Sequence, residues 1–132
     1  MEDKEFVTTR NKNFINFDEV ITLINREVQY SSGILSGCDG YVITEKIEGM
    51  NYRVTVQFER FHVKTAFDIE LALNGLYDLD EIKEKIEQSC KTAIIFLVNR
   101  SYKIENILTW ISKSNIVNIQ ILVLHVQKMI VL

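Results

Sequence analysis

The fold of this chain is decided by residues 37–61, which read GCDGYVITEKIEGMNYRVTVQFERF. Two stretches, Tyr41–Lys46 and Tyr52–Phe61, flank a short glycine-containing connection at residues 47–51. Such a pattern predicts a β-hairpin. Side chains alternate between the two faces of a strand, so in the second stretch one face is apolar and the other polar. The apolar face carries Val54, Val56 and Phe58, and the polar face carries Arg53, Thr55, Gln57 and Glu59.

Upstream of the hairpin, the spacing of apolar residues predicts an amphipathic helix. Apolar side chains recur at i, i+3, i+4, i+7 and i+11, at Phe17, Val20, Ile21, Ile24 and Val28. Asn16 can cap this helix, with Glu19 reaching back to the cap residue. We expect the helix to end near Gln29, and a short strand around Val28–Leu35 to complete an antiparallel meander with the hairpin.

Downstream of the hairpin, the pattern predicts a helical region followed by a strand–helix–strand unit. The expected elements are helix Thr65–Leu76, helix Asp80–Cys90 after a break at Gly75–Asp78, strand Ala93–Val98, helix Ile104–Ser112 and strand Ile119–Val126. A strand–helix–strand unit of this length implies parallel neighbours and a right-handed crossover. The predicted fold is therefore α/β, a mixed sheet flanked by helices. Residues 1–13 are expected to form a flexible arm, and residues 14–132 a single domain.

Composition limits the classes of function. The chain has 132 residues, 47% of them hydrophobic, and a net charge of −3 without a basic block, which disfavours strong electrostatic binding to nucleic acid. Cys38 and Cys90 are expected to be free thiols, because neither lies in a metal-binding spacing. No apolar run approaches the ~18 residues of a membrane helix, and the charged start carries no secretory signal. We therefore expect a cytoplasmic protein without a membrane partner.

The residues around the hairpin resemble a known family. The stretch Gly37-Cys38-Asp39-Gly40-Tyr41-Val42-Ile43, followed by Val56-Gln57-Phe58-Glu59-Arg60-Phe61, is similar to the core of Mrr-type restriction endonucleases, in the PD-(D/E)xK nuclease superfamily. The resemblance extends to Phe17-Asp18-Glu19 upstream and to residues 95–102 and 115–119 downstream. It implies a restriction-endonuclease-like sheet, an antiparallel meander plus a parallel strand–helix–strand unit.

The resemblance also implies a Mg²⁺-dependent site that hydrolyses DNA. Its metal ligands would be Glu19, Asp39 and Gln57, its catalytic residues Asp39, Gln57 and Glu59, and its nucleic-acid contacts Arg60 and Lys64. Oxygen ligands suit Mg²⁺, which polarises a phosphate and acidifies a water. In this family a lysine occupies the position of Glu59, and a carboxylate cannot stabilise developing negative charge as an ammonium does. Lys64 or Lys46 would have to supply that cation.

Simpler interpretations of the same residues stay open. Asp39 also suits an Asp-Gly turn, Gln57 and Glu59 a solvated strand face, and Glu19 a helix cap. Three hypotheses of function follow. The first is a Mg²⁺-dependent DNA endonuclease of a defence or mobile-element system. The second is a non-catalytic nuclease-like module that binds a protein or nucleic acid, and the third an unrelated α/β interaction protein.

The apolar C-terminal end provides a separate prediction. Val126–Leu132 is rich in aliphatic side chains that water would solvate poorly. We expect this end to pack on a sheet edge, or to pair with another chain in a homodimer or with a larger partner protein.

Overall fold

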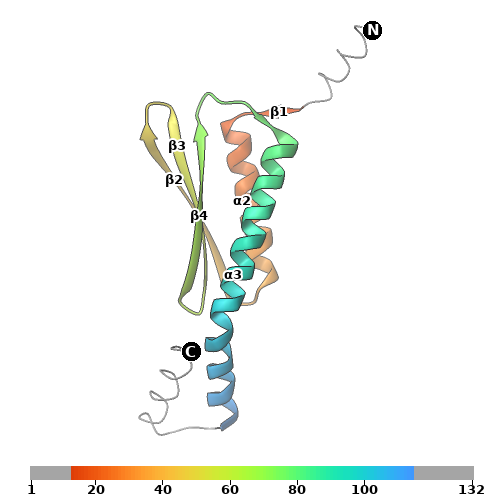
Figure 1. The fold of residues 1–132 in the computed structure, drawn as a ribbon, viewed down its shortest axis with the longest axis vertical. Helices are drawn as coiled ribbons and strands as arrows, with labels where there is room; N and C mark the ends of the chain where they lie inside the picture. The colour runs from red at the N-terminus through yellow and green to blue at the C-terminus, as the bar shows by residue number, and fades with distance from the viewer. Residues whose placement is uncertain (1–12, 115–132) are drawn as a thin grey trace, which may run out of the picture.

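The computed structural model describes residues 13–114, which form two layers (Figure 1). In chain order the elements are β1 (Phe14–Ile15), α2 (Phe17–Ile34), β2 (Cys38–Glu48), β3 (Asn51–Arg60), β4 (Val63–Ala72), β5 (Tyr77–Asp78) and α3 (Leu79–Ser114). Strands β2, β3 and β4 form an antiparallel sheet in that order. Both helices pack on one face of it, α2 against β2 and α3 against β4 and β3. The expected α/β class is confirmed.

Helix α2 forms where the apolar spacing predicts it. Its first turn is closed by a capping box, in which the side chain of Asn16 accepts from the backbone of Glu19 at 3.0 Å and Glu19 accepts from the backbone of Asn16 at 3.1 Å. The helix continues past the expected end at Gln29 to Ile34, so the predicted strand at Val28–Leu35 is wrong. Ser31 lies one turn after Val28 and stays buried, which continues the inward-facing stripe.

The predicted hairpin is confirmed as β2 and β3, and two two-residue turns join the three strands. Glu48 pairs with Asn51 across the first turn, and Arg60 pairs with Val63 across the second. In the first turn Gly49 has a φ of 58°, which suits glycine at the first central position of a type II′ turn. The central strand β3 buries Val54, Val56 and Phe58 completely under the helices.

Strand β4 contradicts the prediction of a helix at Thr65–Leu76. Five side chains at every second position turn toward the helices, Val63, Thr65, Phe67, Ile69 and Leu71, and Ile69 and Leu71 are each 2% exposed. Some of these residues are also spaced four apart, as in a helix. The segment is a strand because it pairs with β3 over ten residues. This pairing gives hydrogen-bond partners to the backbone groups that face β3, and it buries the same apolar side chains.

Helix α3 contradicts the prediction of a strand at Ala93–Val98. Residues 79–114 form a single helix of 36 residues, whose far end continues beyond the sheet (Figure 1). From residue 82 to residue 101 its buried side chains are spaced three or four apart: Ile82, Ile86, Cys90, Ala93, Leu97 and Ser101. The buried side chains of residues 93–98 continue the helical spacing that begins at Ile82. Burial of this stripe therefore favours a helix, although β-branched residues have a lower helix propensity.

The parallel strand–helix–strand unit is therefore absent from residues 13–114. Its first predicted strand belongs to α3, and its second, Ile119–Val126, lies outside the described residues. The N-terminal arm, up to residue 12, and the C-terminal end at Val126–Leu132 also lie outside them.

A short ladder fixes where the two helices begin. Strand β1 pairs with β5, which places Phe14 beside Asp78 and Ile15 beside Tyr77. The backbone of Leu79 also donates to the carbonyl of Asn13 at 2.8 Å. The helices start together at this end and run in the same direction along the sheet (Figure 1). No helix of the described region is long and apolar enough to span a membrane.

Candidate functional site

Three residues of the predicted nuclease site share the open face of the sheet. Asp39 lies directly opposite Glu59 in the β2–β3 register, and Gln57 lies two residues along β3 on the same side. Directly opposite side chains in an antiparallel pair have Cα atoms about 4.5–5.5 Å apart. The structure therefore brings these three side chains to one end of the face that the helices leave uncovered.

Lys64 joins the same row. It pairs with Glu59 in the β3–β4 register, so Asp39, Glu59 and Lys64 form one line across the three strands. Asp39 and Lys64 are exposed, and Glu59 and Gln57 are partly buried. Lys64 is thus the cross-strand neighbour of Glu59, which stands where the endonucleases that the hairpin resembles carry a lysine.

The donor set of this row suits Mg²⁺ only in part. Two carboxylates and an amide oxygen are ligands of the kind that Mg²⁺ accepts, usually together with water. Between residues 13 and 114, however, no group of three or more His, Cys, Asp or Glu side chains gathers to hold a metal ion. Within the described residues, Lys64 and Glu59 do not form an ion pair either. The oxygen donors of this row are thus not gathered into a metal site within residues 13–114.

Glu19 does not reach this row. Its carboxylate is engaged at the first turn of α2, where it accepts from the backbone of Asn16. Asp39 follows the other end of that helix. From Glu19 to the last residue of α2, a rise of ~1.5 Å per residue gives about 22 Å. Helix α2 also covers the opposite face of the sheet, so the structure does not bring Glu19 together with Asp39.

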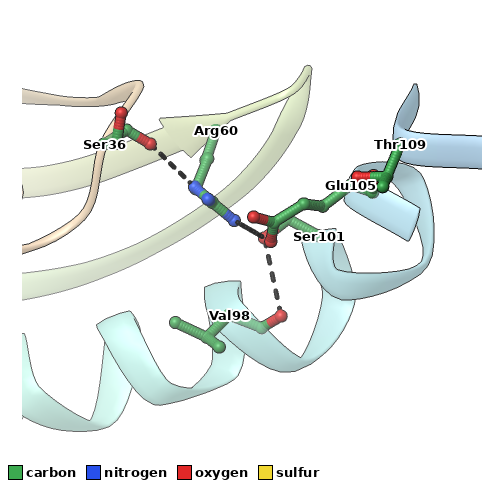
Figure 2. A network of polar contacts seen from close by, with 6 residues as sticks. All are labelled: Ser36, Arg60, Val98, Ser101, Glu105 and Thr109. Atoms are coloured by element: carbon green, nitrogen blue, oxygen red, sulfur yellow. Dashed lines mark hydrogen bonds and ion pairs between the residues drawn. The ribbon is translucent and has the colours of Figure 1, made fainter. Parts of the chain in front are cut away.

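Arg60 is an internal residue, which contradicts its assignment as a nucleic-acid contact. Its side chain points to the helix side of the sheet and is 7% exposed. Figure 2 shows its guanidinium donating to the carbonyl of Ser36 at 3.0 Å, to the hydroxyl of Ser101 at 3.2 Å and to the carboxylate of Glu105 at 3.2 Å. These contacts join β3, the α2–β2 loop and α3, and they hold the guanidinium on the helix side of the sheet, away from the open face that carries Asp39 and Gln57.

A groove lies between α2 and α3, and sequence analysis did not identify it. It has a volume of about 620 Å³ and is lined mainly by apolar surface. Three of its side chains are well exposed: Tyr30 at 68%, Ile34 at 62% and Ile95 at 53%. A smaller hollow, lined by Leu23, Lys83 and Ile86, continues it toward the start of the helices. We call these two hollows together the α2–α3 groove.

Charged side chains of both signs border the α2–α3 groove. Arg26 and Glu27 come from α2, and Glu87 and Lys91 come from α3. Within the described residues none of the four takes part in an ion pair. The sequence did carry a signal for this groove. Tyr30 and Ile34 are large apolar residues of α2 that lie outside its buried stripe, which is formed by Phe17, Val20, Ile24 and Val28. The partner helix that turns these residues into one wall of a groove could not be identified from the sequence.

The two thiols are not activated nucleophiles. Burial raises the pKa of Cys90 to about 11, and the nearby Glu27 carboxylate acts in the same direction. Burial also raises the pKa of Cys38, and the charge of Asp39 adds to this effect. A reactive cysteine needs a lowered pKa. Both cysteines are free thiols, as expected from the sequence.

Comparison with protein-family models, with curated proteins and with solved structures finds no match to this chain.

Proposed function

We propose that this chain is a non-catalytic protein-binding module, and that the α2–α3 groove holds an amphipathic helix of a partner protein. The observation that carries the proposal is the apolar groove itself, with Tyr30, Ile34 and Ile95 exposed along it. Exposed apolar side chains that gather in a concave surface mark interaction sites.

The length of the groove suits a helix. On α2 its lining runs from Leu23 to Ile34, which at ~1.5 Å per residue is about 16 Å. That span equals three turns of a bound helix, enough for anchors at i, i+3 or i+4, and i+7. Helices α2 and α3 lie side by side (Figure 1), and a third helix can lie along the groove between them.

The charges at the rim indicate what kind of helix fits. Arg26 and Lys91 favour acidic residues on the partner, whereas Glu27 and Glu87 favour basic residues. A helix with an apolar stripe flanked by charges of both signs complements this rim. A nucleic acid does not, since two carboxylates line the groove and the chain carries a net charge of −3.

The test uses a displayed library of amphipathic helical peptides with three apolar anchors and variable charged flanks. Bound peptides are mapped by amide chemical-shift changes. We expect the changes to fall on residues 23–34 and 83–95. Ile34→Asp and Ile95→Asp should each weaken binding at least about tenfold, because a charge replaces an anchor contact. Ile43→Asp is the matched control, since Ile43 is similarly exposed at 54% but lies on the open face of the sheet.

Two results would refute this proposal. One is a library that yields no binder. The other is a set of binders whose shift changes fall on the open sheet face, around Asp39 and Gln57, with Ile34→Asp without effect.

A second candidate is a Mg²⁺-dependent DNA endonuclease, favoured by the row of Asp39, Glu59 and Lys64 with Gln57 beside it. The resemblance to Mrr-type restriction endonucleases supports this candidate at the hairpin, and the helical state of Ala93–Val98 counts against the topology that it implies. In this candidate Asp39 and Gln57 would hold Mg²⁺, which would polarise the phosphate, and Lys64 would offset developing charge.

A plasmid cleavage assay with Mg²⁺ or Mn²⁺ separates the two candidates. If the nuclease candidate is correct, Asp39→Ala and Lys64→Ala lose cleavage, while Glu45→Ala, farther along the same face of β2, retains it. Absence of cleavage by the unmodified chain, together with groove binding, leaves the binding module as the function.

A further inference from the structure

Among residues 13–114, strand β4 forms an edge of the sheet and presents an open row of backbone groups. The β3–β4 turn has two residues, so its flanking pair, Arg60 and Val63, exchanges backbone hydrogen bonds. Hydrogen-bonded pairs then alternate along the ladder. The N–H and C=O groups of every second residue from Lys64 onward therefore point away from β3, at Lys64, Ala66, Asp68, Glu70 and Ala72.

Tyr77 supports this assignment and closes one end of the row. Its hydroxyl accepts from the backbone N–H of Ala72 at 2.7 Å, on the side away from β3. In the part of the chain that the structure describes, the outward groups of the other four residues have no such partner. The open row thus spans Lys64 to Glu70.

A second groove runs beside this edge, on the other side of α3 from the α2–α3 groove. It has a volume of about 540 Å³, and its lining includes Phe67 of β4 and Ser89, Thr92 and Phe96 of α3. Phe96 is 46% exposed. An unpaired strand edge next to an exposed aromatic side chain is a surface that another strand can extend.

We propose that this surface is a dimer interface, in which β4 of a second copy of the chain pairs antiparallel with β4 about a two-fold axis at Phe67. Charge complementarity selects this partner and this register. Lys64 then lies opposite the partner's Glu70, and Glu70 lies opposite the partner's Lys64. Ala66 lies opposite the partner's Asp68, so no like charges face each other directly.

Shifted registers are less favourable. An axis at Asp68 places two carboxylates opposite each other and separates Lys64 from Glu70. An axis at Ala66 pairs Lys64 with the partner's Asp68, but it brings Glu70 against the partner's β3–β4 turn at His62 and shortens the ladder. Only the axis at Phe67 uses the whole strand from Val63 to Leu71.

The helices fit the same symmetry. Because α3 lies above β4, the two copies of α3 meet across the axis. Ser89 and Thr92 have small side chains that allow close approach, and Phe96 comes against the partner's Gln88. Two three-stranded sheets become one six-stranded sheet with all four helices on one face. Pairing removes the open edges of β4 and covers the exposed ring of Phe96.

Sedimentation velocity over a wide concentration range tests the proposal on the full chain. The unmodified chain should be a concentration-dependent dimer. Lys64→Glu and Glu70→Lys should each raise the dimer dissociation constant at least about tenfold, since each turns two attractions into two repulsions. The double variant, which carries both Lys64→Glu and Glu70→Lys, should have a dimer dissociation constant close to that of the unmodified chain. Lys46→Glu, an exposed position on β2, is the control and should leave the constant unchanged.

The double variant separates dimerisation from folding. Each single charge reversal also faces a like charge within its own sheet, at Glu59 or Arg53, and the double variant keeps both of these repulsions. Its recovery therefore reports contacts between chains. A double variant as weak as the single variants, or a monomeric unmodified chain, would overturn the proposal.

Oxidative cross-linking tests the register. Cα atoms of a non-hydrogen-bonded pair lie about 4.5 Å apart, within disulfide range. Phe67→Cys should form a covalent dimer, and Ala66→Cys should not. Faster cross-linking of Ala66→Cys would overturn this pairing. A monomer in which the outward amides of Lys64, Ala66, Asp68 and Glu70 are protected from hydrogen exchange would assign the edge to another segment of the same chain, again overturning the proposal.

Discussion

The β3–β4 turn carries a backbone conformation that its side chains oppose. Phe61 has a φ of 51° and His62 a φ of 66°, both in the left-handed region. Two such residues in a two-residue hairpin form a type I′ turn, where Asn-Gly is the preferred pair. The turn accepts Phe-His because pairing of β3 with β4 over ten residues fixes the geometry at its ends. We therefore predict that His62→Gly stabilises the protein.

The expected gain follows from two opposing effects. A left-handed residue other than glycine costs about 1–2 kcal/mol, and glycine removes that cost. Glycine also gains freedom in the unfolded chain, which takes back about 0.5–1 kcal/mol. His62 is exposed, and within the described residues its side chain makes no hydrogen bond or ion pair, so little else is lost. The net gain in the free energy of unfolding is about 0.5–1 kcal/mol.

Phe61 is less suitable for this test. Its ring is partly buried, and the guanidinium of Arg60 lies 4.6 Å from the ring centroid. A change at Phe61 would therefore combine relief of strain with lost packing.

Urea unfolding and thermal melting measure the effect. The melting temperature of His62→Gly should rise by about 2–4 °C. His62→Ala is the matched control, because it removes the imidazole but keeps the left-handed cost, and it should leave stability nearly unchanged. Gly49→Ala, at a φ of 58° in the other turn, should lose about 1 kcal/mol. Equal stabilities for His62→Gly and His62→Ala would refute the argument from strain.

Three further predictions concern the interior. Arg60→Met should lower the free energy of unfolding, measured in urea, by about 2–4 kcal/mol, because Glu105 and two other acceptors lose their donor. Arg60→Lys should restore less than half of that free energy. Gly40→Ala should lower the free energy of unfolding by about 1–3 kcal/mol, since the added Cβ would lie 2.5 Å from a methyl of Val28. A free energy equal to that of the unmodified chain would contradict this packing. The Cys90 thiol should react with alkylating reagents only on unfolding, because burial raises its pKa to about 11. The folded state holds that proton more tightly than the unfolded state, so this contribution to stability should be present below pH 9.0 and decline toward pH 11.

The candidate sites were predictable to different degrees. Strand alternation correctly placed Gln57 and Glu59 on the face opposite Val56 and Phe58, because side-chain direction in a strand depends only on sequence parity, and the same parity puts Arg60 on the helix side. The contacts that bury Arg60 come from residues more than 20 positions away, and no local pattern indicated them. Glu19 was correctly described as a capping residue, and its distance from Asp39 became clear only from the arrangement of α2 on the sheet.

By itself, the sequence determined the elements whose signals are local. The α2 cap at Asn16 and the β2–β3 hairpin around Gly49 are set by interactions among near neighbours in the chain, so their residue types predict them. Tertiary structure decided Val63–Ala72 and Ala93–Val98, whose apolar residues suit either a strand or a helix. The first segment is a strand because β3 offers it a ladder, and the second is helical because it continues the buried stripe of α3 over the sheet. The α2–α3 groove and the β4 edge exist for the same reason, since each is made of segments that only packing brings together.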